Sequence, residues 1–464
     1  MKAFTLRGDT IAAIATPLGS GGMGVVRVSG EEALNVVLKV FSPSNKTAIK
    51  DHTVTHGVLI DPVDGVEFEE VMVTYMAGPR SYTCEDVVEI GCHGGITAVR
   101  STLSALISSG ARLAEPGEFT FRAFIAGRID LAQAEAVVDM VSAPTNVSLK
   151  TARQQLKGAL STEVESLRSS CLDILASLEA EIDFSEDDVP SVDRVILQDR
   201  LVEIWSMLND VLKDADKGAR LRHGVRVVII GSPNVGKSSI LNCLLRNDRA
   251  IVTEIPGTTR DSIEEGMTIG GIPFVITDTA GIRDATDPVE SEGVSRSGQI
   301  LLQSDVALLV IDGSRVLGKP DRDAVALVKN SGKKYVVVVN KIDLNMIVST
   351  QEIESICPRG KLEFVSAATG EGIDALSESL ANLVFTEQLN PGEYPLVMNE
   401  RHRSVLSDAR GSIQMSIDAV VDGLPADFVT IGLQSAVRSL GEISGQDATE
   451  DLLGTIFSKF CIGK

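Results

Sequence analysis

Several kinds of residue are scarce in this sequence of 464 residues, and each scarcity excludes a class of protein. Aromatic residues make up 4% of the chain, with a single tryptophan, so we do not expect a surface that stacks successive nucleic-acid bases. No uninterrupted apolar run reaches about eighteen residues, which argues against a transmembrane helix. The apolar stretch at residues 11–15 is too short for the core of a signal peptide. The six cysteines are scattered, which favours a reduced, cytoplasmic compartment.

Positive charge is also in short supply. Lysine and arginine total 43 against 64 aspartates and glutamates, which leaves a net charge of −21. Because the phosphate backbone of a nucleic acid is held mainly by basic side chains, this balance argues against a broad nucleic-acid-binding surface. Any role on RNA would need a local basic patch or the help of a partner.

The length predicts about three domains, at roughly 150 residues each. In residues 1–121, short strand-like runs and glycine-rich turns alternate with one helical stretch, which indicates an α+β domain. The strand-like runs are residues 10–16, 24–28, 71–75 and 87–90, and the helical stretch is residues 31–40. In residues 122–221, apolar side chains recur every three or four positions, as at Leu172, Leu175 and Leu178, which predicts long amphipathic helices.

Strands and helices alternate in residues 222–384, which is the pattern of a doubly wound α/β domain. The expected strands are residues 225–230, 273–278, 306–311 and 335–340. Helical periodicity returns in residues 385–464, at 413–421 and 452–460. Since the ends of a compact domain often lie close together, we expect the two helical segments to form one domain into which the α/β domain is inserted.

A phosphate-binding motif follows the first of these strands. It reads Gly231-Ser232-Pro233-Asn234-Val235-Gly236-Lys237-Ser238, followed by Ser239 and a helical run. In such a loop, backbone N–H groups turn toward a polyphosphate, Lys237 brings a positive charge to the outer phosphates, and the Ser238 hydroxyl can ligate Mg²⁺. The N-terminus of the helix adds its own positive partial charge. The motif predicts a nucleoside triphosphate site.

Three more motifs select guanine and complete the site. They are Asn340-Lys341-Ile342-Asp343, Ser366-Ala367-Ala368 and Asp278-Thr279-Ala280-Gly281, each at the end of an expected strand. The Asp343 carboxylate can accept hydrogen bonds from both N–H donors of guanine, which adenine does not offer. A backbone amide of the second motif can reach the guanine carbonyl. The third motif places a carboxylate near Mg²⁺ and a glycine amide near the γ-phosphate. The set resembles the translation-factor-like GTPases.

One departure from many small GTPases bears on catalysis. The residue after Gly281 is Ile282, which cannot orient a water molecule as a glutamine would. A second loop reads Thr253-Glu254-Ile255-Pro256-Gly257-Thr258-Thr259, and it offers Thr259 as a Mg²⁺ ligand and several backbone oxygens. Together with the side-chain oxygen of Asn234, these oxygens can surround a monovalent cation that neutralises charge in the transition state.

The residue that positions the water is left open by spacing alone. Four carboxylates follow the third motif, namely Asp284, Asp287, Glu290 and Glu292. Nothing in their spacing separates a catalytic carboxylate from an ordinary acidic loop.

The whole chain resembles the MnmE (TrmE) family of tRNA-modification GTPases. The resemblance rests on the α+β start, the helical region, the G domain and the terminal Cys461-Ile462-Gly463-Lys464. It also rests on runs that other G proteins lack, at residues 81–89, 93–95, 116–124 and 130–136.

The resemblance implies a potassium-dependent GTPase whose G domains dimerise across their nucleotides. It implies a homodimer that assembles with the FAD-dependent partner MnmG into a heterotetramer. The complex would install a carboxymethylaminomethyl-type group on C5 of the wobble uridine, position 34, of certain tRNAs. The N-terminal domain would resemble folate-binding one-carbon domains and hold 5-formyl-tetrahydrofolate or a related folate.

The resemblance also implies residue roles. Potassium would be held by Asn234, Thr253, Ile255 and Thr258, and Mg²⁺ by Ser238 and Thr259. Glu290 falls on the position of the catalytic glutamate. Folate would be held by Arg27, Glu89, Arg128 and Lys464, although the family often has lysine where Arg128 stands, which changes the geometry of the charge. Without the family, Arg27 and Glu89 suit an ordinary ion pair between strands.

Alternatives remain at this point. Cys461 is either a reactive thiol or an inert one. The chain is either a modification enzyme, a non-enzymatic GTP-dependent switch acting in translation, or a folate enzyme regulated by GTP. The absence of a recognisable basic RNA-binding module after the G domain disfavours the switch.

Overall fold

The computed structural model describes residues 8–45, 48–183, 192–213, 215–247, 264–278, 298–358, 360–384 and 399–464. The chain divides into two compact units. The first comprises Met1–Val138, Leu156–Pro190 and Thr430–Lys464, and the second comprises Asp139–Gln155 and Ser191–Val429. Among the helices in the described ranges, none combines the length and the apolar character that crossing a bilayer requires.

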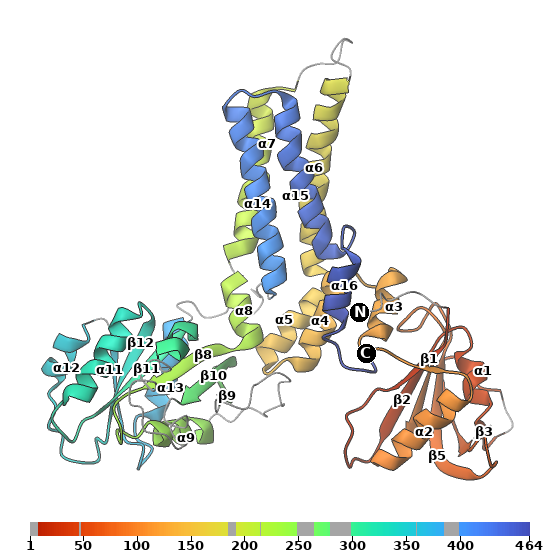
Figure 1. Ribbon diagram of the computed structural model, residues 1–464, viewed down its shortest axis with the longest axis horizontal. Coiled ribbons are helices and arrows are strands. Elements are labelled where there is room, and N and C mark those ends of the chain that lie inside the picture. Colours follow the sequence, from red (N-terminus) through yellow and green to blue (C-terminus); the bar gives the residue numbers. More distant parts are fainter. Residues whose placement is uncertain are drawn as a thin grey trace. The chain divides into compact units, whose positions relative to one another are not determined.

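The first unit contains a seven-stranded sheet in the order β3-β4-β5-β6-β2-β1-β7 (Figure 1). Neighbouring strands are antiparallel except for β1 and β7, which are parallel. The strands are β1 Ile11–Ile14, β2 Gly24–Ser29, β3 Phe41–Pro43, β4 Thr53–Ile60, β5 Glu67–Met76, β6 Val87–Cys92 and β7 Arg112–Leu113.

Alternation along the strands gives this sheet two different faces. Ala12, Val26 and Val28 pack in one core with the helices α1 (Ala33–Leu38) and α2 (Ile96–Ser108). Because successive side chains of a strand point to opposite faces, Arg27 and Glu89 lie on the other face. They are also partners in the β2–β6 register, directly opposite one another.

Helices of the first unit bring the end of the chain to that second face. They are α3 Glu118–Ile125, α4 Leu131–Ser142, α6 Ala159–Asp183, α15 Ala426–Ser444 and α16 Glu450–Phe457, of which α4 and α15 continue into the second unit. The rings of Phe121 and Phe457 meet edge to face with centroids 5.2 Å apart, which fixes α16 against α3. The tail then reaches β1, where Gly463 has φ +98° and a Cβ would overlap the carbonyl oxygen of Ile14. Only glycine fits there without strain.

The second unit contains helices and a second sheet. The helices outside the sheet domain are α5 Asn146–Leu156, α7 Arg194–Lys213, α8 Ala215–His223 and α14 Glu400–Val421. Arg410 of α14 donates a hydrogen bond of 2.9 Å to Asn209 of α7 and lies over the ring of Trp205. These contacts hold α14 along α7.

The second sheet has six strands in the order β13-β12-β11-β8-β10-β9. Its strands are β8 Val225–Ile230, β9 Glu264–Ile269, β10 Ile272–Asp278, β11 Val306–Asp312, β12 Lys334–Asn340 and β13 Lys361–Val365. All adjacent pairs are parallel except β9 with β10. The helices α9 (Lys237–Asn247) and α13 (Ile373–Val384) cover one face. The helices α11 (Lys319–Asn330) and α12 (Thr350–Ile356) cover the other.

The predicted strands of both sheets are confirmed, as are the helices near residues 31–40, 413–421 and 452–460. The prediction missed α2, β3, β4, β7 and β9. The first four lie in residues 1–121, where the expected pattern had other strands and turns. The last is an antiparallel edge strand, which the alternation of strands and helices does not indicate.

Candidate functional site

The predicted nucleotide motifs lie at one edge of the second sheet. Because β8, β10, β11, β12 and β13 are parallel, the loops that follow them leave the sheet at the same edge. Open parallel sheets bind ligands at this carboxyl edge, where strand order and helix termini leave a crevice. The fold therefore gathers motifs that are far apart in the sequence.

The phosphate-binding loop lies between β8 and α9. Lys237 is the first residue of α9, and its Nζ donates to the carbonyl oxygens of Gly231 and Ser232 at 3.0 and 2.9 Å. The hydroxyl of Ser238 donates to the Asp278 carboxylate at 2.6 Å, while Ser239 is exposed. The structure thus brings together a lysine ammonium, a hydroxyl and a carboxylate from two motifs.

Asn340 joins the base-recognition loop to two others. Its amide nitrogen donates to the carbonyl of Val235 at 2.8 Å, and its amide oxygen accepts from the backbone N–H of Ala367 at 3.0 Å. Gly236 has φ +97°, and a Cβ there would overlap the Asn340 amide, so this close approach requires glycine. The asparagine therefore holds three predicted loops in one arrangement.

The remaining residues of the two guanine motifs, Asp343 and Ser366, are in direct contact. The hydroxyl of Ser366 donates to the Asp343 carboxylate at 2.6 Å, and Ala368 belongs to the same turn as Ser366. Lys341 donates to Asp312 at 2.6 Å. Asn234 is exposed in the phosphate loop and has a left-handed φ of +63°, a conformation that asparagine tolerates.

Several predicted residues lie outside the described residues. They are Thr253, Glu254, Ile255, Pro256, Gly257, Thr258, Thr259, Thr279, Ala280, Gly281 and Glu290. Within the described residues, the nucleotide site therefore consists of the phosphate loop, Asp278 and the two guanine motifs.

The structure adds one acidic residue, Asp312, that sequence reasoning did not single out. Asp312, at the end of β11, binds Lys341 and both the N–H and the hydroxyl of Ser314. Burial raises the pKa of Asp312, but the hydrogen bonds from Lys341 and Ser314 outweigh it, so the net pKa is lowered. The carboxylate therefore stays charged beside the base-recognition lysine. Its position as the last residue of a buried strand was the available signal.

A second cluster gathers the four residues predicted to hold folate. On β2 and β6, Arg27 and Glu89 form an ion pair of 2.8 Å, and Arg27 also donates to the carbonyl of Gly463 at 3.2 Å. The guanidinium carbons of Arg27 and Arg128 lie 5.7 and 5.2 Å from the ring centre of Tyr82. Arg27 and Glu89 are therefore an ion pair between strands, as the residues alone suggested.

Lys464 completes this cluster. Burial, followed by the nearby charge of Arg27, lowers the pKa of the Lys464 ammonium. Two positive charges therefore lie near one another at the end of the chain, and that of Arg27 is paired with Glu89.

Tyr82 is the residue of this cluster to which sequence reasoning gave no role. It lies in the loop between β5 and β6 and shares a hydrogen bond of 2.9 Å with the Thr120 hydroxyl. Burial raises the pKa of Tyr82 despite the opposing effects of Thr120, Arg27 and Arg128. The phenol therefore remains neutral, and its ring is in contact with two cations. Its place in the 81–89 run was the only sequence signal.

A buried arginine supports the loop that carries Tyr82. Arg122 of α3 is 4% exposed and forms ion pairs with Asp9, Glu85 and Glu118 at 2.9–3.0 Å. Burial lowers the pKa of Arg122, but Glu85 and Glu118 outweigh it, so the net pKa is raised. This network ties β1, α3 and the 81–86 loop together.

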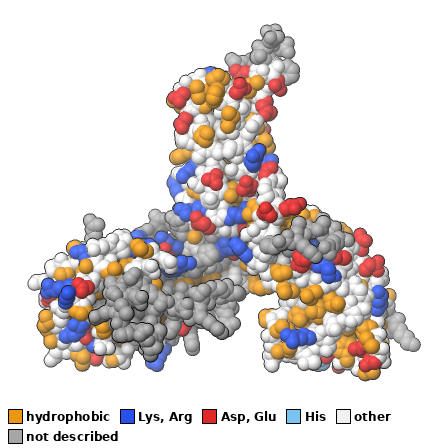
Figure 2. All heavy atoms as spheres, viewed as in Figure 1, with side chains coloured by type: hydrophobic (Ala, Val, Ile, Leu, Met, Phe, Trp, Pro, Cys, Tyr) orange, Lys and Arg blue, Asp and Glu red, His pale blue; other side chains and the backbone are white. Residues whose placement is uncertain are grey.

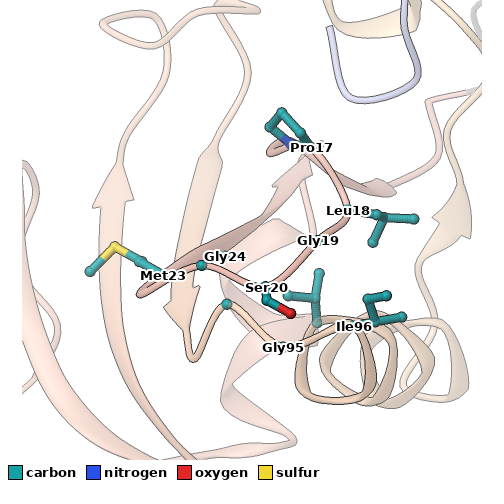
Figure 3. Close-up of a pocket in the computed structure, with 11 residues that line it drawn as sticks. Pro17, Leu18, Gly19, Ser20, Met23, Gly24, Gly95 and Ile96 are labelled. Atoms are coloured by element: carbon teal, nitrogen blue, oxygen red, sulfur yellow. The ribbon is translucent and has the colours of Figure 1, made fainter.

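A separate pocket of about 210 Å³ lies between the 17–24 loop and the start of α2 (Figure 3). Its lining residues are Pro17, Leu18, Gly19, Ser20, Gly21, Met23, Gly24, Gly94, Gly95, Ile96 and Val99. The Met23 side chain points away from those of Leu18 and Ile96 (Figure 3). All of these residues are uncharged, so the pocket is distinct from the charged cluster around Tyr82.

Cys461, the possible reactive thiol, is exposed near the end of the chain.

Comparisons with known proteins match the two parts of the chain separately. Residues 10–128 match the family model described as GTP-binding protein TrmE N-terminus, and residues 131–461 match the MnmE helical domain. A tRNA modification GTPase MnmE of Ligilactobacillus salivarius is 43% identical, over 98% of this chain and 98% of the relative. That of Heliobacterium modesticaldum is 45% identical, over 98% of this chain and all of the relative.

Among solved structures, the FeoB G domain of Methanococcus jannaschii is 23% identical with a TM-score of 0.27, and it covers 34% of this chain and 97% of its own. That likeness is too weak to carry an argument. The family models and the near full-length relatives decide the matter, and the chain belongs to the MnmE (TrmE) family of tRNA modification GTPases.

Proposed function

We propose that this chain hydrolyses GTP to drive the modification of C5 of the wobble uridine, position 34, in certain tRNAs. The product would be a carboxymethylaminomethyl-type group, made with folate-borne carbon and an FAD-dependent partner, MnmG. The observation that carries the proposal is Asn340, which holds the phosphate loop and both guanine motifs together at the sheet edge. The relatives are named tRNA modification GTPase, which supports a GTP-dependent modification of tRNA.

Guanine selection would depend on Asp343. Because the Ser366 hydroxyl donates to one carboxylate oxygen, it fixes the plane of the carboxylate, and the remaining lone pairs of the two oxygens can accept from both N–H donors of guanine. A base without two adjacent N–H donors would leave this acceptor unpaired, which costs binding free energy. The backbone N–H of Ala368 would meet the guanine carbonyl.

The phosphates would lie over the loop at residues 234–239. Backbone N–H groups of the loop and the start of α9 point toward an anion at such a helix terminus. Lys237 would neutralise the outer phosphates. Gly281 would contribute its amide to the γ-phosphate, together with Thr279 and Ala280 of the same motif.

Ser238 and Asp278 fit a magnesium ion. Their oxygens, held 2.6 Å apart, are the hard ligands that Mg²⁺ prefers, and Thr259 would add a second hydroxyl. Bound Mg²⁺ supplies neutralisation of the charge that develops on the phosphates. Asn234, exposed in the loop, fits a role in holding K⁺ with Thr253, Ile255 and Thr258. Glu290 would orient the attacking water and accept its proton.

The cluster around Tyr82 fits a folate. Glu89 can accept from the amino and ring N–H donors of a pterin, and Arg27, Arg128 and Lys464 suit a glutamate tail. A bound formyl-folate supplies the one-carbon unit. The exposed Cys461 lies three residues before Lys464 in the sequence, so a reactive thiol there remains part of the proposal.

Partners would supply what this acidic chain lacks. On the face drawn in Figure 2, the coloured lysine and arginine side chains are interspersed with acidic and apolar ones and form no single broad basic surface. With a net charge of −21, the chain needs positive surface from MnmG to hold tRNA. We propose a cytoplasmic homodimer that joins MnmG in a heterotetramer.

The proposed domains follow the motifs. Residues 1–121 would form the folate-binding-like domain and residues 222–384 the inserted G domain. Residues 122–221 and 385–464 would form the helical domain.

Mass spectrometry of wobble nucleosides tests the proposal. Cells lacking the protein should lose the modified uridine, the intact gene should restore it, and a Lys237→Ala gene should not. Normal modification in the deletion strain would refute the proposal.

A further inference from the structure

The phosphate-binding loop is held by a hydrogen-bond network in which Ser232 and Asp321 are buried and Arg315 is partly exposed. The Ser232 hydroxyl donates to the Asp321 carboxylate at 2.5 Å and accepts from the Arg315 guanidinium at 2.7 Å. Ser232 is 5% exposed and Asp321 is 3% exposed. A buried polar group of this kind holds its geometry firmly, because losing one partner leaves another unsatisfied.

Asp321 is itself fixed on several sides. Arg315 donates to both of its carboxylate oxygens, at 2.8 and 2.9 Å, and the backbone N–H of Gly318 donates at 2.9 Å. Burial raises the pKa of Asp321, but the hydrogen bonds from Ser232, Arg315 and Gly318 outweigh it and the net pKa is lowered. The two-pronged arginine contact fixes orientation as well as charge.

Topology explains why these residues meet. The strands β8 and β11 are parallel neighbours, with Ile230 opposite Leu309, so the loops after them leave the sheet side by side. The loop after β11 leads directly into α11, where Asp321 lies in the first turn. The phosphate loop is therefore next to a helix start that contributes none of the four nucleotide motifs.

The backbone carbonyl of Ser232 contacts the lysine of the phosphate loop. The carbonyl oxygen of Ser232 accepts from Nζ of Lys237 at 2.9 Å. Ser232 thus contacts Asp321 through its hydroxyl and Lys237 through its carbonyl oxygen, so the three residues are connected in series.

We propose that Arg315 and Asp321 are positioning residues that, through Ser232, hold Lys237 in place for the outer phosphates before nucleotide binds. This inference rests on the proposed GTP site. Its expected signature is a uniform loss of GTP and GDP affinity when the network is broken, because a preformed loop lowers the cost of ordering for either nucleotide.

The decisive variants are Ser232→Ala and Arg315→Met in the full chain. Each should weaken GTP and GDP binding about tenfold, as measured by fluorescence of labelled nucleotides, and raise KM by a similar factor. The saturated rate, kcat, should change less than about twofold, because uniform binding is lost. The preference for GTP over ATP should be unchanged, and Arg315→Lys should restore part of the affinity.

Arg322→Met is the matched control. Arg322 is exposed on the same helix, so its removal changes the charge equally without touching Ser232. Its nucleotide affinity should equal that of the unmodified chain.

The outcomes separate this inference from the proposed function. If the unmodified chain binds neither GTP nor GDP, the proposed function fails. If it binds both and Ser232→Ala binds them equally well, the positioning role fails. A loss of affinity matched by a fall in the nucleotide-free melting temperature, or a loss shared by Arg322→Met, would also overturn it.

Discussion

Asn340 and Val235 lie 105 residues apart in the sequence, and a hydrogen bond of 2.8 Å joins the side-chain amide of one to the carbonyl oxygen of the other. The loop that would recognise the base is therefore physically joined to the loop that would hold the phosphates. A change at Asn340 should therefore weaken the contacts to both the base and the phosphates of a nucleotide.

Replacing Asn340 with alanine tests this connection. The variant loses the contacts to Val235 and Ala367, each worth about 0.5–1.5 kcal/mol net, so affinity for GTP and GDP should fall about 5- to 150-fold. Equilibrium binding of labelled nucleotide measures it. Asn330→Ala, an exposed change at the end of α11, is the control and should bind normally. Unchanged affinity in Asn340→Ala would show that the loops are held in other ways.

The proposed role of Glu290 gives a kinetic prediction. Glu290→Ala should lower kcat by about a hundredfold or more, since general-base catalysis contributes that much, while GTP affinity changes less than about twofold. Glu292→Ala should retain its rate. Single-turnover hydrolysis and nucleotide binding are measured side by side. Equal losses of rate and affinity would make Glu290 structural.

A cation prediction concerns Asn234. Exchanging Na⁺ for K⁺ should raise GTP turnover and promote pairing of G domains, and Asn234→Ala should abolish that response while retaining the slow rate in Na⁺. Steady-state hydrolysis and light scattering follow the two effects. Identical turnover in both salts would rule out the proposed potassium site.

The chain end gives a prediction about folate. Gly463→Ala adds one methyl group against the Ile14 carbonyl, so it should displace the tail and weaken folate binding about tenfold or more with Lys464 still present. A chain lacking Lys464 should lose a similar amount. Calorimetry with 5-formyl-tetrahydrofolate measures both. Ile462→Ala, at an exposed position, is the control and should bind normally.

The buried network around Arg122 predicts a pH dependence of stability. Hydrogen bonds from Arg112 lead the causes that lower the pKa of Asp9 below 3.8. Burial raises the pKa of Glu118, but Arg112, the Glu115 N–H and Arg122 outweigh it and bring the pKa below 4.5. Because both folded pKa values lie below the unfolded values, these carboxylates stabilise the fold above pH 4.5, and the stabilisation is lost as pH falls through the folded values.

Arg122→Met should therefore destabilise the first unit by about 1–3 kcal/mol at pH 7, since Asp9 and Glu118 keep Arg112 but lose their second arginine and Glu85 loses its ion pair. The difference from the unmodified chain should narrow below pH 3.8. Thermal unfolding as a function of pH measures this difference, with the exposed Arg100→Met as the control. A difference that stays constant down to pH 3 would contradict the assignment.

Sequence reasoning placed the second sheet well because its strands are continuous apolar runs followed by distinctive motifs. It identified Lys237, Asn340 and Ser366, whose contacts follow from parallel strands that end at one edge. It did not find Arg315 or Asp321, because their contact with Ser232 depends on β8 and β11 being neighbours. The residue spacing within β8 and β11 does not show that the two strands are neighbours in the sheet.

The first unit shows the same limit. Alternation along β2 and β6 allows Arg27 and Glu89 to be an ion pair, but the register that places them opposite one another comes from the fold. Tyr82 lies in a loop without periodicity, so only the three-dimensional arrangement shows that Arg27 and Arg128 both pack against its ring.

The hydrogen bond from Arg27 to Gly463 spans 436 residues of sequence. During translation at about 5–20 residues per second, Arg27 would be added to the chain roughly 20–90 s before Gly463. The N-terminal sheet must therefore persist through most of synthesis with its second face incomplete. The cluster around Tyr82 can assemble only as one of the last events in making the protein.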